Sequence, residues 1–560
     1  MTDDNSTTGG RLIVEALLAH GVEVVFCVPG ESYLEVLDAL YEARDKIRLV
    51  TCRHENGAAY MAEAYAKLTG RAGVCLVTRG PGACNASIGI HTAFQDSTPV
   101  VLLIGQVSRP HIGREAFQEV DFKAQFKPLS KWADEMEKAA QAPGLIAEAF
   151  RQALSGRPGP AVLSMPEDLL GQSCGPVEAT PMSVERPGPK PGDMERLHRM
   201  VADCRRPLMM VGGGGWTAKA IRDIHAFAAA NRMAVCCSFR RHDLFDNRHP
   251  GFIGEMGIGP DPALIERFRE ADLLIVAGAR LGEMTTQGYT LIEAPKPRQA
   301  LVHVHPGAGE LGRVFEPVLG IHSSMPAFAE AAAALAPAEK NRWLEWAGEA
   351  RDDYEKNRVP KPPPGRLDLA GMMTWLDGRL PDDAVVTVDA GNFAGWPQRY
   401  LTFGGGRRLL GAANGSMGYG APSAVAAAIV QPGRTVVGFA GDGGFAMTGI
   451  EVATAVHYRA KPLIVVFNNS MYGTIRMHQE RRFPGRVIGT DLSAPDFAAM
   501  ARSLGAFGER VGKTEDFAPA VERALKSDRA AVIELIVDPE IINTRTTLSE
   551  IRARAMGEGG

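Results

Sequence analysis

The sequence predicts an α/β protein of three doubly wound parallel-sheet domains, with a Rossmann-like central domain and a first and third domain that resemble each other. Three observations predict this fold. Short apolar, β-branched runs alternate with longer helical patterns along the chain, as in parallel sheets with helical crossovers. Two stretches rich in Pro and Gly interrupt that alternation. A strand–glycine turn–helix–strand pattern in the first part recurs in the last part.

The apolar runs have the length and composition of parallel strands that are buried on both faces. The clearest runs are residues 24–26, 208–211, 273–276, 385–388 and 463–467. Strands of this kind that alternate with helices indicate doubly wound domains.

The two stretches rich in Pro and Gly, residues 171–193 and 358–365, are predicted linkers. Neither has a hydrophobic period, and the second reads RVPKPPPG, which is typical of a stiff polyproline-type spacer. The predicted domains are therefore residues 1–172, 190–340 and 366–545.

The first and third domains share an order of features. In the first, an apolar strand leads into the turn GPG at 80–82, then a helix and another strand. In the third, an apolar strand leads into the turn GDG at 441–443, then a helix and another strand. Two sister domains could hold the two ends of one cofactor. The alternative is that any two βαβ units look alike.

Composition argues against several classes of protein. The net charge of −4 does not favour a nucleic-acid partner. No uncharged apolar stretch approaches about 18 residues, so no membrane span is expected. The polar N-terminus has no apolar signal core, and the eight cysteines form no C-x-x-C pair. We therefore expect a reduced, cytoplasmic protein without a zinc or redox motif.

The strongest chemical signal is the sequence GDGG at 441–444, with Asn469 placed 27 positions after Asp442. Both sites end apolar strands, and the carboxyl ends of parallel strands line the ligand crevice of an open sheet. Glycines let backbone N–H groups approach a diphosphate, and Asp442 and Asn469 carry oxygens that suit Mg²⁺. The alternative is a glycine turn with an Asp cap and an Asn turn, which the Asn-Asn pair at the next strand end disfavours.

A second signal is Glu55, which follows a strand at 49–51 and opens a predicted helix over 58–68. A carboxylate in this position commonly compensates the helix dipole, so Glu55 alone could be a structural cap. No Ser-His-Asp arrangement, HExxH or P-loop motif points to another chemistry. The glycines at 212–215 lack the full dinucleotide fingerprint, and a structural turn explains them at least as well.

Together these motifs resemble the thiamine-diphosphate-dependent enzymes. The GDG…NN spacing resembles their cofactor signature, and the sequence RHE at 53–55 resembles their glutamate site. Four further motifs resemble the acetolactate synthase large-subunit group: GPGACN at 80–85, GQV at 105–107, AFQE at 116–119 and MGYGAP at 417–422. These matches run in order along nearly the whole chain.

The resemblance implies a role for each matching residue. Glu55 would bond N1′ of the aminopyrimidine, Met417 would bend the cofactor so that N4′ approaches C2, and the Gly415 carbonyl would accept from N4′. Mg²⁺ would be held by Asp442, Asn469 and the Met471 carbonyl. The rest of thiamine diphosphate would contact Asn85, Gly391, Asn392, Phe393, Gly441, Gly443, Gly444, Tyr472 and Gly473. The catalytic, substrate-facing side would comprise Glu55 with Gly30, Phe117 and Gln118.

The same resemblance implies decarboxylation of a 2-oxo acid and carboligation to an aldehyde or second 2-oxo acid. It also implies a homodimer or homotetramer, because Glu55 and Asp442 of one site would come from different subunits. The segment 470–479 lacks the Gln-Trp pair usual in biosynthetic acetolactate synthases, which leaves the acceptor open. FAD in the central domain is left open too, because HVHP at 303–306 replaces the usual acidic strand end.

Other functions remain as alternatives. One is a thiamine-diphosphate-dependent lyase acting on 2-hydroxyacyl-CoA, oxalyl-CoA, glyoxylate or benzoin-type donors. Another is a non-catalytic paralogue, against which the joint presence of Glu55, Met417, Asp442 and Asn469 argues. A nicotinamide oxidoreductase is a third, but the sequence lacks its glycine fingerprint followed by an acid.

Overall fold

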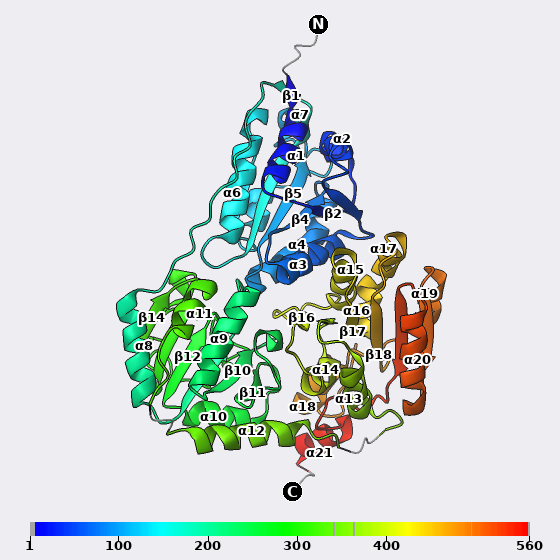
Figure 1. Ribbon diagram of the computed structural model, residues 1–560. Coiled ribbons are helices and arrows are strands. Elements are labelled where there is room, and N and C mark those ends of the chain that lie inside the picture. The colour runs from blue at the N-terminus through cyan, green and yellow to red at the C-terminus, as the bar shows by residue number, and fades with distance from the viewer. Residues whose placement is uncertain (1–5, 340–341, 362–364, 494, 558–560) are drawn as a thin grey trace. The chain divides into compact units, whose positions relative to one another are not determined.

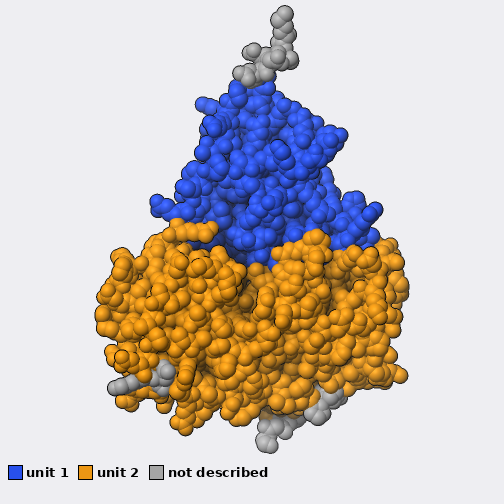
Figure 2. Space-filling view, in the orientation of Figure 1, with its two compact units in different colours: residues 1–185, 425–430, 448–460 blue, residues 186–424, 431–447, 461–560 orange. Residues whose placement is uncertain are grey.

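The computed structural model describes residues 6–339, 342–361, 365–493 and 495–557. Among them are three six-stranded sheets, each made of parallel strands and flanked by helices, which confirms the predicted fold class (Figure 1). A small antiparallel pair, β1 (Thr7–Thr8) with β8 (Ser173–Cys174), forms a fourth sheet. The chain divides into two compact units, coloured separately in Figure 2. Unit 1 is residues 1–185, 425–430 and 448–460, and unit 2 is residues 186–424, 431–447 and 461–560.

The sheet of unit 1 has the strand order β3-β2-β4-β5-β7-β6. Its strands are β2 (Val24–Cys27), β3 (Arg48–Thr51), β4 (Gly73–Val77), β5 (Val100–Gln106), β6 (Trp132–Glu135) and β7 (Pro160–Pro166). On one face, a single apolar core joins the sheet to α1 (Gly9–Ala19), α2 (Leu34–Glu42) and α6 (Ala142–Leu154). The paired helices α3 (Glu55–Thr69) and α4 (Pro81–Asp96) also pack on this sheet. Coverage by helices explains why the inner strands are apolar throughout.

The first sheet of unit 2 has the strand order β11-β10-β9-β12-β13-β14. In chain order this is 3-2-1-4-5-6, the Rossmann order, so the prediction of a Rossmann-like central domain is confirmed. Its strands are β9 (Pro207–Val211), β10 (Ala234–Ser238), β11 (Phe252–Met256), β12 (Leu273–Ala277), β13 (Ala300–His305) and β14 (Leu319–His322). Its main helices are α8 (Pro191–Asp203), α9 (Ala218–Ala230), α10 (Pro262–Glu270), α11 (Met325–Ala333) and α12 (Leu344–Arg358).

The last sheet has the strand order β16-β15-β17-β18-β20-β19, which repeats the order of the sheet in unit 1 strand for strand. The predicted likeness of the first and third domains is therefore confirmed. Its strands are β15 (Val385–Val388), β16 (Arg408–Gly411), β17 (Val436–Gly441), β18 (Leu463–Asn468), β19 (Phe507–Val511) and β20 (Ala531–Ile536). The helices of this part include α13 (Leu369–Arg379), α14 (Gly395–Tyr400), α15 (Gly420–Val430), α16 (Asp442–Thr448), α17 (Val452–His457), α18 (Gly473–Arg482), α19 (Phe497–Ser503), α20 (Thr514–Lys526) and α21 (Leu548–Met556).

The predicted linkers have little regular structure, although the first contains the two-residue strand β8. The first ends earlier than expected, because α8 begins at Pro191, a residue type that suits the start of a helix. The middle of the second, residues 362–364, lies outside the described residues. The domain boundaries stay a prediction. In the described part of the chain, every helix is too short or too polar to cross a membrane.

A buried ion cluster ties α3 to α4. The Lys67 ammonium lies 2.9 Å from a Glu63 carboxylate oxygen and also pairs with Asp96. All three side chains are at most 7% exposed, and the Thr98 hydroxyl donates to Glu63. Two buried carboxylates therefore share one buried cation, a situation in which removing one partner is costly.

We expect Lys67→Met to lower the free energy of unfolding by roughly 3–5 kcal/mol, because both carboxylates lose a buried cationic partner. Urea denaturation of the full chain measures this loss. The control is Lys123→Met, whose 2.8 Å pair with Asp134 involves a 56% exposed lysine and should cost at most about 1 kcal/mol. Equal, small losses in the two variants would contradict a stabilising role for the buried cluster.

Candidate functional site

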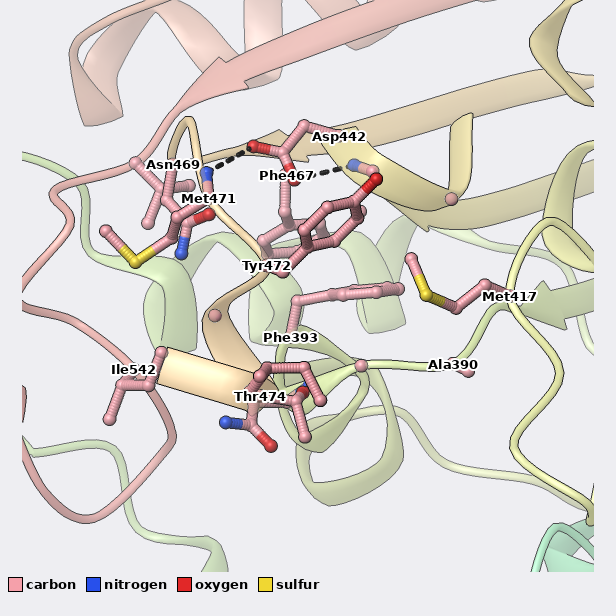
Figure 3. A pocket seen from close by; sticks show the side chains of 18 of the residues that line it. Ala390, Phe393, Met417, Asp442, Phe467, Asn469, Met471, Tyr472, Thr474 and Ile542 are labelled. Carbon is pink, nitrogen blue, oxygen red and sulfur yellow. Dashed lines mark hydrogen bonds between the residues drawn. The ribbon is translucent and has the colours of Figure 1, made fainter. Parts of the chain in front are cut away.

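A cavity of about 220 Å³ lies at the carboxyl ends of β15, β17 and β18 in unit 2 (Figure 3). It collects residues from the segments that follow five strands, β15, β16, β17, β18 and β20, because the carboxyl ends of parallel strands meet at one edge of the sheet. All thirteen residues of this part that the sequence predicted to hold a cofactor line the cavity: Gly391, Asn392, Phe393, Gly415, Met417, Gly441, Asp442, Gly443, Gly444, Asn469, Met471, Tyr472 and Gly473. Their roles there stay predictions.

Asp442 is the first residue of α16 and is 4% exposed. Its carboxylate accepts the N–H of Gly443 at 2.7 Å and the N–H of Met471 at 3.2 Å (Figure 3). Burial raises the pKa of Asp442 above its usual range, and these backbone donors oppose that rise. A cation next to the carboxylate would offset the cost of burying its charge.

The two asparagines at the end of β18 do different things. Asn468 donates its side-chain amide to the buried Glu534 at 2.7 Å, which is a structural contact, whereas Asn469 lines the cavity. The Met471 carbonyl accepts the N–H of Gly473 at 2.8 Å and keeps a second lone pair. Among the described residues, no three His, Cys, Asp or Glu side chains gather as a metal site. A cation here would therefore need amide, carbonyl and diphosphate oxygens, which are ligands that Mg²⁺ accepts.

The glycines of the cavity keep its space open. A Cβ atom on Gly443 would lie 2.6 Å from the Tyr472 ring and 3.2 Å from the Met417 methyl group. Gly391 has φ +146, and a Cβ there would lie 2.8 Å from the Phe393 ring. At these positions the backbone packs directly against aromatic rings with no Cβ in between, and such glycine backbone suits the close approach of a diphosphate group.

The predicted residues Glu55, Asn85, Gly30, Phe117 and Gln118 belong to unit 1. Glu55 opens α3, but the residue that caps this helix is His54, whose ring accepts the N–H of Asn56. The Glu55 carboxylate instead accepts from the Asn85 side chain at 2.9 Å. These contacts favour a role for Glu55 beyond that of a helix cap.

Gly30 and Gln118 lie against neighbouring residues of one turn at the end of β4. A Cβ on Gly30 would lie 2.4 Å from the Cβ of Thr78, and a Cβ on Gly80 would lie 2.7 Å from the Gln118 carbonyl oxygen. Gln118 itself has φ +66, and the Phe117 side chain is 73% exposed. Close packing, against a side chain at Gly30 and against backbone at Gly80, therefore requires both glycines at this edge of the sheet.

Sequence reasoning missed Glu451, which is fully buried in unit 1. Its carboxylate accepts the backbone N–H groups of Arg53 and His54, both at 3.0 Å, and so fixes the turn from which Glu55 extends. Burial raises the pKa of Glu451. Apolar residues of the cavity wall were also missed: Trp396, Phe467, Ile475, Val537, Ile541 and Ile542.

The central domain gives no support to FAD among its described residues. His303, within β13, is buried and its Nε2 lies 2.9 Å from the Ala279 carbonyl oxygen. The loop after β9 contacts the loop after β12 directly, since a Cβ on Gly213 would lie 2.0 Å from the Gly278 carbonyl oxygen. These groups serve contacts within the domain.

Three family models match the chain in order. They are the thiamine pyrophosphate enzyme N-terminal TPP binding domain over residues 7–125, the central domain over 194–332 and the C-terminal TPP binding domain over 389–535. The last of these contains most of the turns that line the cavity.

Similar curated proteins cover nearly the full chain. The large subunit of acetolactate synthase isozyme 2 from Escherichia coli is 32% identical, and the match covers 95% of each chain. The probable acetolactate synthase large subunit of Methanocaldococcus jannaschii is 30% identical, over 95% of this chain and 92% of that protein. A putative thiamine pyrophosphate-containing protein, YdaP of Bacillus subtilis, is also 30% identical over the same shares.

Proposed function

The chain belongs to the acetolactate synthase large-subunit group of thiamine-diphosphate-dependent enzymes, and from this premise we propose that it decarboxylates a small 2-oxo acid and joins the remaining fragment to a second carbonyl compound. The observation that carries the proposal is the cavity of unit 2, in which Asp442, Asn469 and Met417 come together. When bound, thiamine diphosphate supplies the nucleophilic carbon and the electron sink for C–C chemistry.

We propose that Mg²⁺ accompanies the cofactor. Asp442, Asn469 and the Met471 carbonyl would hold it, and diphosphate oxygens and water would complete its coordination. The buried Asp442 carboxylate, whose pKa is raised by burial, supports this proposal because a cation would compensate its charge.

The residues of unit 1 complete the proposed site. Glu55 would hydrogen-bond the aminopyrimidine, with Asn85 orienting its carboxylate. Gly30, Phe117 and Gln118 would face the substrate. Following the family resemblance, we propose that Glu55 acts with Asp442 of a partner subunit, so that the active protein is at least a homodimer. A cytoplasmic location stays a prediction.

The rival lyase functions and a non-catalytic role are less well supported. The relatives named above as acetolactate synthases favour carboligation, and Glu55, Met417, Asp442 and Asn469 are all present. We do not include FAD, because no contact among the described residues of the central domain supports it.

We expect carboligation to exceed aldehyde release when the holoenzyme receives excess pyruvate, or another 2-oxo acid that it accepts. The acyl fragment left after loss of CO₂ is either protonated or attacks a second carbonyl, and protonation requires a placed acid. Phe117 and Gln118 offer an apolar wall and an amide but no ready proton donor. CO₂ release and the coupled product are measured together over a panel of 2-oxo acids.

The control in this assay is the same chain stripped of cofactor and metal, which should release no CO₂. Mainly free aldehyde from the holoenzyme would contradict the carboligase proposal. Cleavage of an acyloin or a 2-hydroxyacyl-CoA, with no 2-oxo acid decarboxylated, would replace it with the lyase alternative.

A further inference from the structure

One buried acid that the proposed mechanism does not use lies among three turns of the cofactor cavity. Asp389 follows β15, the middle strand of the neighbouring trio β16-β15-β17, and is 1% exposed. The turns after these three strands contribute Asn392, Met417 and Asp442 to the cavity. Asp389 therefore occupies the position from which one side chain can reach both neighbouring turns.

The Asp389 carboxylate makes these contacts. One oxygen accepts the N–H of Gly418 at 3.1 Å, and the other accepts the N–H groups of Ala390 at 2.7 Å and Tyr419 at 3.3 Å. A Cβ on Gly444 would lie 2.6 Å from an Asp389 oxygen, so the carboxylate also abuts the first turn of α16. Two N–H groups of residues 415–419, the Met417 loop, are thus held by the Asp389 carboxylate.

A residue of the central domain holds the backbone of Asp389. Arg240, which follows β10 and is 4% exposed, donates its guanidinium to the Asp389 backbone carbonyl at 2.9 Å. Its side chain passes closely along the end of β16, because a Cβ on Gly411 would lie 2.8 Å from the Arg240 Cδ. A residue of the central domain thereby sets the position of the acid that holds the Met417 loop.

A negative charge has a chemical reason here. Burial raises the pKa of Asp389 to about 6, while the backbone N–H groups lower it. A carboxylate can accept at both oxygens, whereas an asparagine would turn an NH₂ group toward an N–H donor. Hydrogen bonds to a charged acceptor are also the stronger kind. The site therefore retains an unfavourable buried charge in return for two acceptor oxygens that face backbone donors.

We propose that Asp389 is a positioning residue that holds the Met417 loop in the geometry the cofactor requires, and that Arg240 of the central domain keeps Asp389 in place. The proposal rests on the proposed function, since it concerns the same cavity. It gives the central domain a role in catalysis that needs no bound nucleotide.

The test compares Asp389→Asn with Asp377→Asn in the full-length holoenzyme. Asp377 is a matched structural acid of the same domain, which accepts the N–H of Thr402 at 2.8 Å and pairs with Arg407 away from the cavity. Three quantities are measured: thiamine diphosphate affinity in Mg²⁺ by calorimetry, deuterium loss from C2 of the cofactor at saturation, and the melting temperature.

Asp389→Asn should weaken thiamine diphosphate binding by about 10- to 100-fold, the scale of lost outer-shell contacts. At saturating cofactor it should still slow C2 exchange by about 10- to 100-fold, because small misplacements of reacting groups have such effects. Asp377→Asn should lower the melting temperature and leave exchange at saturation unchanged. Arg240→Met should also weaken thiamine diphosphate binding and slow C2 exchange, but by smaller factors than Asp389→Asn. If Asp389→Asn does not fold, Arg240→Met provides the test.

The proposal would be overturned if Asp389→Asn exchanged C2 at the wild-type rate at saturating cofactor. If Asp389→Asn is unfolded, a wild-type exchange rate in Arg240→Met would overturn it. Equal slowing in Asp377→Asn would also overturn it, since any loss of stability would then suffice. A wild-type chain that binds no thiamine diphosphate would instead refute the proposed function, so the two failures are distinguishable.

Discussion

Asp442→Ala is expected to abolish Mg²⁺-dependent binding of thiamine diphosphate, with a loss in affinity of at least about 100-fold, the upper scale for outer-shell partners of a metal. The substitution removes the only carboxylate that we assign to the metal. It also frees the N–H groups of Gly443 and Met471, which shape the turn around it. Calorimetric titration of the variant with the cofactor in Mg²⁺ measures the loss.

The matched control is Asp528→Ala, which removes an 82% exposed acid of the same domain and should bind the cofactor as the wild type does. The fold of Asp442→Ala should be intact by circular dichroism, because the change is local. Tight binding by a folded Asp442→Ala chain would contradict the assignment of the metal ligand.

Glu55→Gln is the second variant with a large expected effect. The amide keeps the shape of the side chain but cannot favour protonation at N1′ of the aminopyrimidine as a carboxyl group does. We expect deuterium loss from C2 of the bound cofactor to slow by about 100-fold, the lower scale of a general acid–base contribution. Exchange is followed by transferring holoenzyme that carries C2-deuterated cofactor into H₂O and quenching samples rapidly.

Glu42→Gln serves as the control, because Glu42 is half exposed, pairs with Arg11 and lies in α2 of the same unit. It should leave the exchange rate unchanged. If Glu55→Gln exchanged C2 deuterium as fast as this control, Glu55 would return to the role of a helix-terminal charge.

Local patterns were sufficient to predict the fold. Parallel strands covered by helices on both faces are apolar throughout, so β9, β12, β15 and β18 were visible as apolar runs. The turns GPG and GDG lie at equivalent strand ends of two sheets with the same strand order. The likeness of the two domains could therefore be predicted from the sequence. The strand orders themselves depend on long-range pairing and appear only in the structure.

The part of the candidate site that could be predicted consists of side chains whose type and spacing in the sequence are distinctive. Asp442 and Asn469 end adjacent strands, β17 and β18, so a fixed separation in sequence places both in one cavity. Glycines of that cavity belong to the same motifs, and at Gly391, Gly443 and Gly444 a Cβ would block a close approach.

Asp389 and Glu451 could not be predicted in this way. Each is an acid that accepts from backbone N–H groups of a distant turn, and every residue except proline supplies such a group. Asp389 reaches Gly418 and Tyr419, and Glu451 reaches Arg53 and His54 from the other end of the chain. No pattern of side chains marks such contacts, so only the folded arrangement reveals them.

The most direct test of the account is the titration of the wild-type chain, stripped of cofactor and metal, with thiamine diphosphate. Saturable binding with one site per chain is expected in Mg²⁺, and strongly weakened binding in a chelator, because Asp442 and the diphosphate would both be ligands of the cation. Absence of binding in Mg²⁺, or equal binding with and without the metal, would contradict the assignment of this cavity as a Mg²⁺–thiamine diphosphate site.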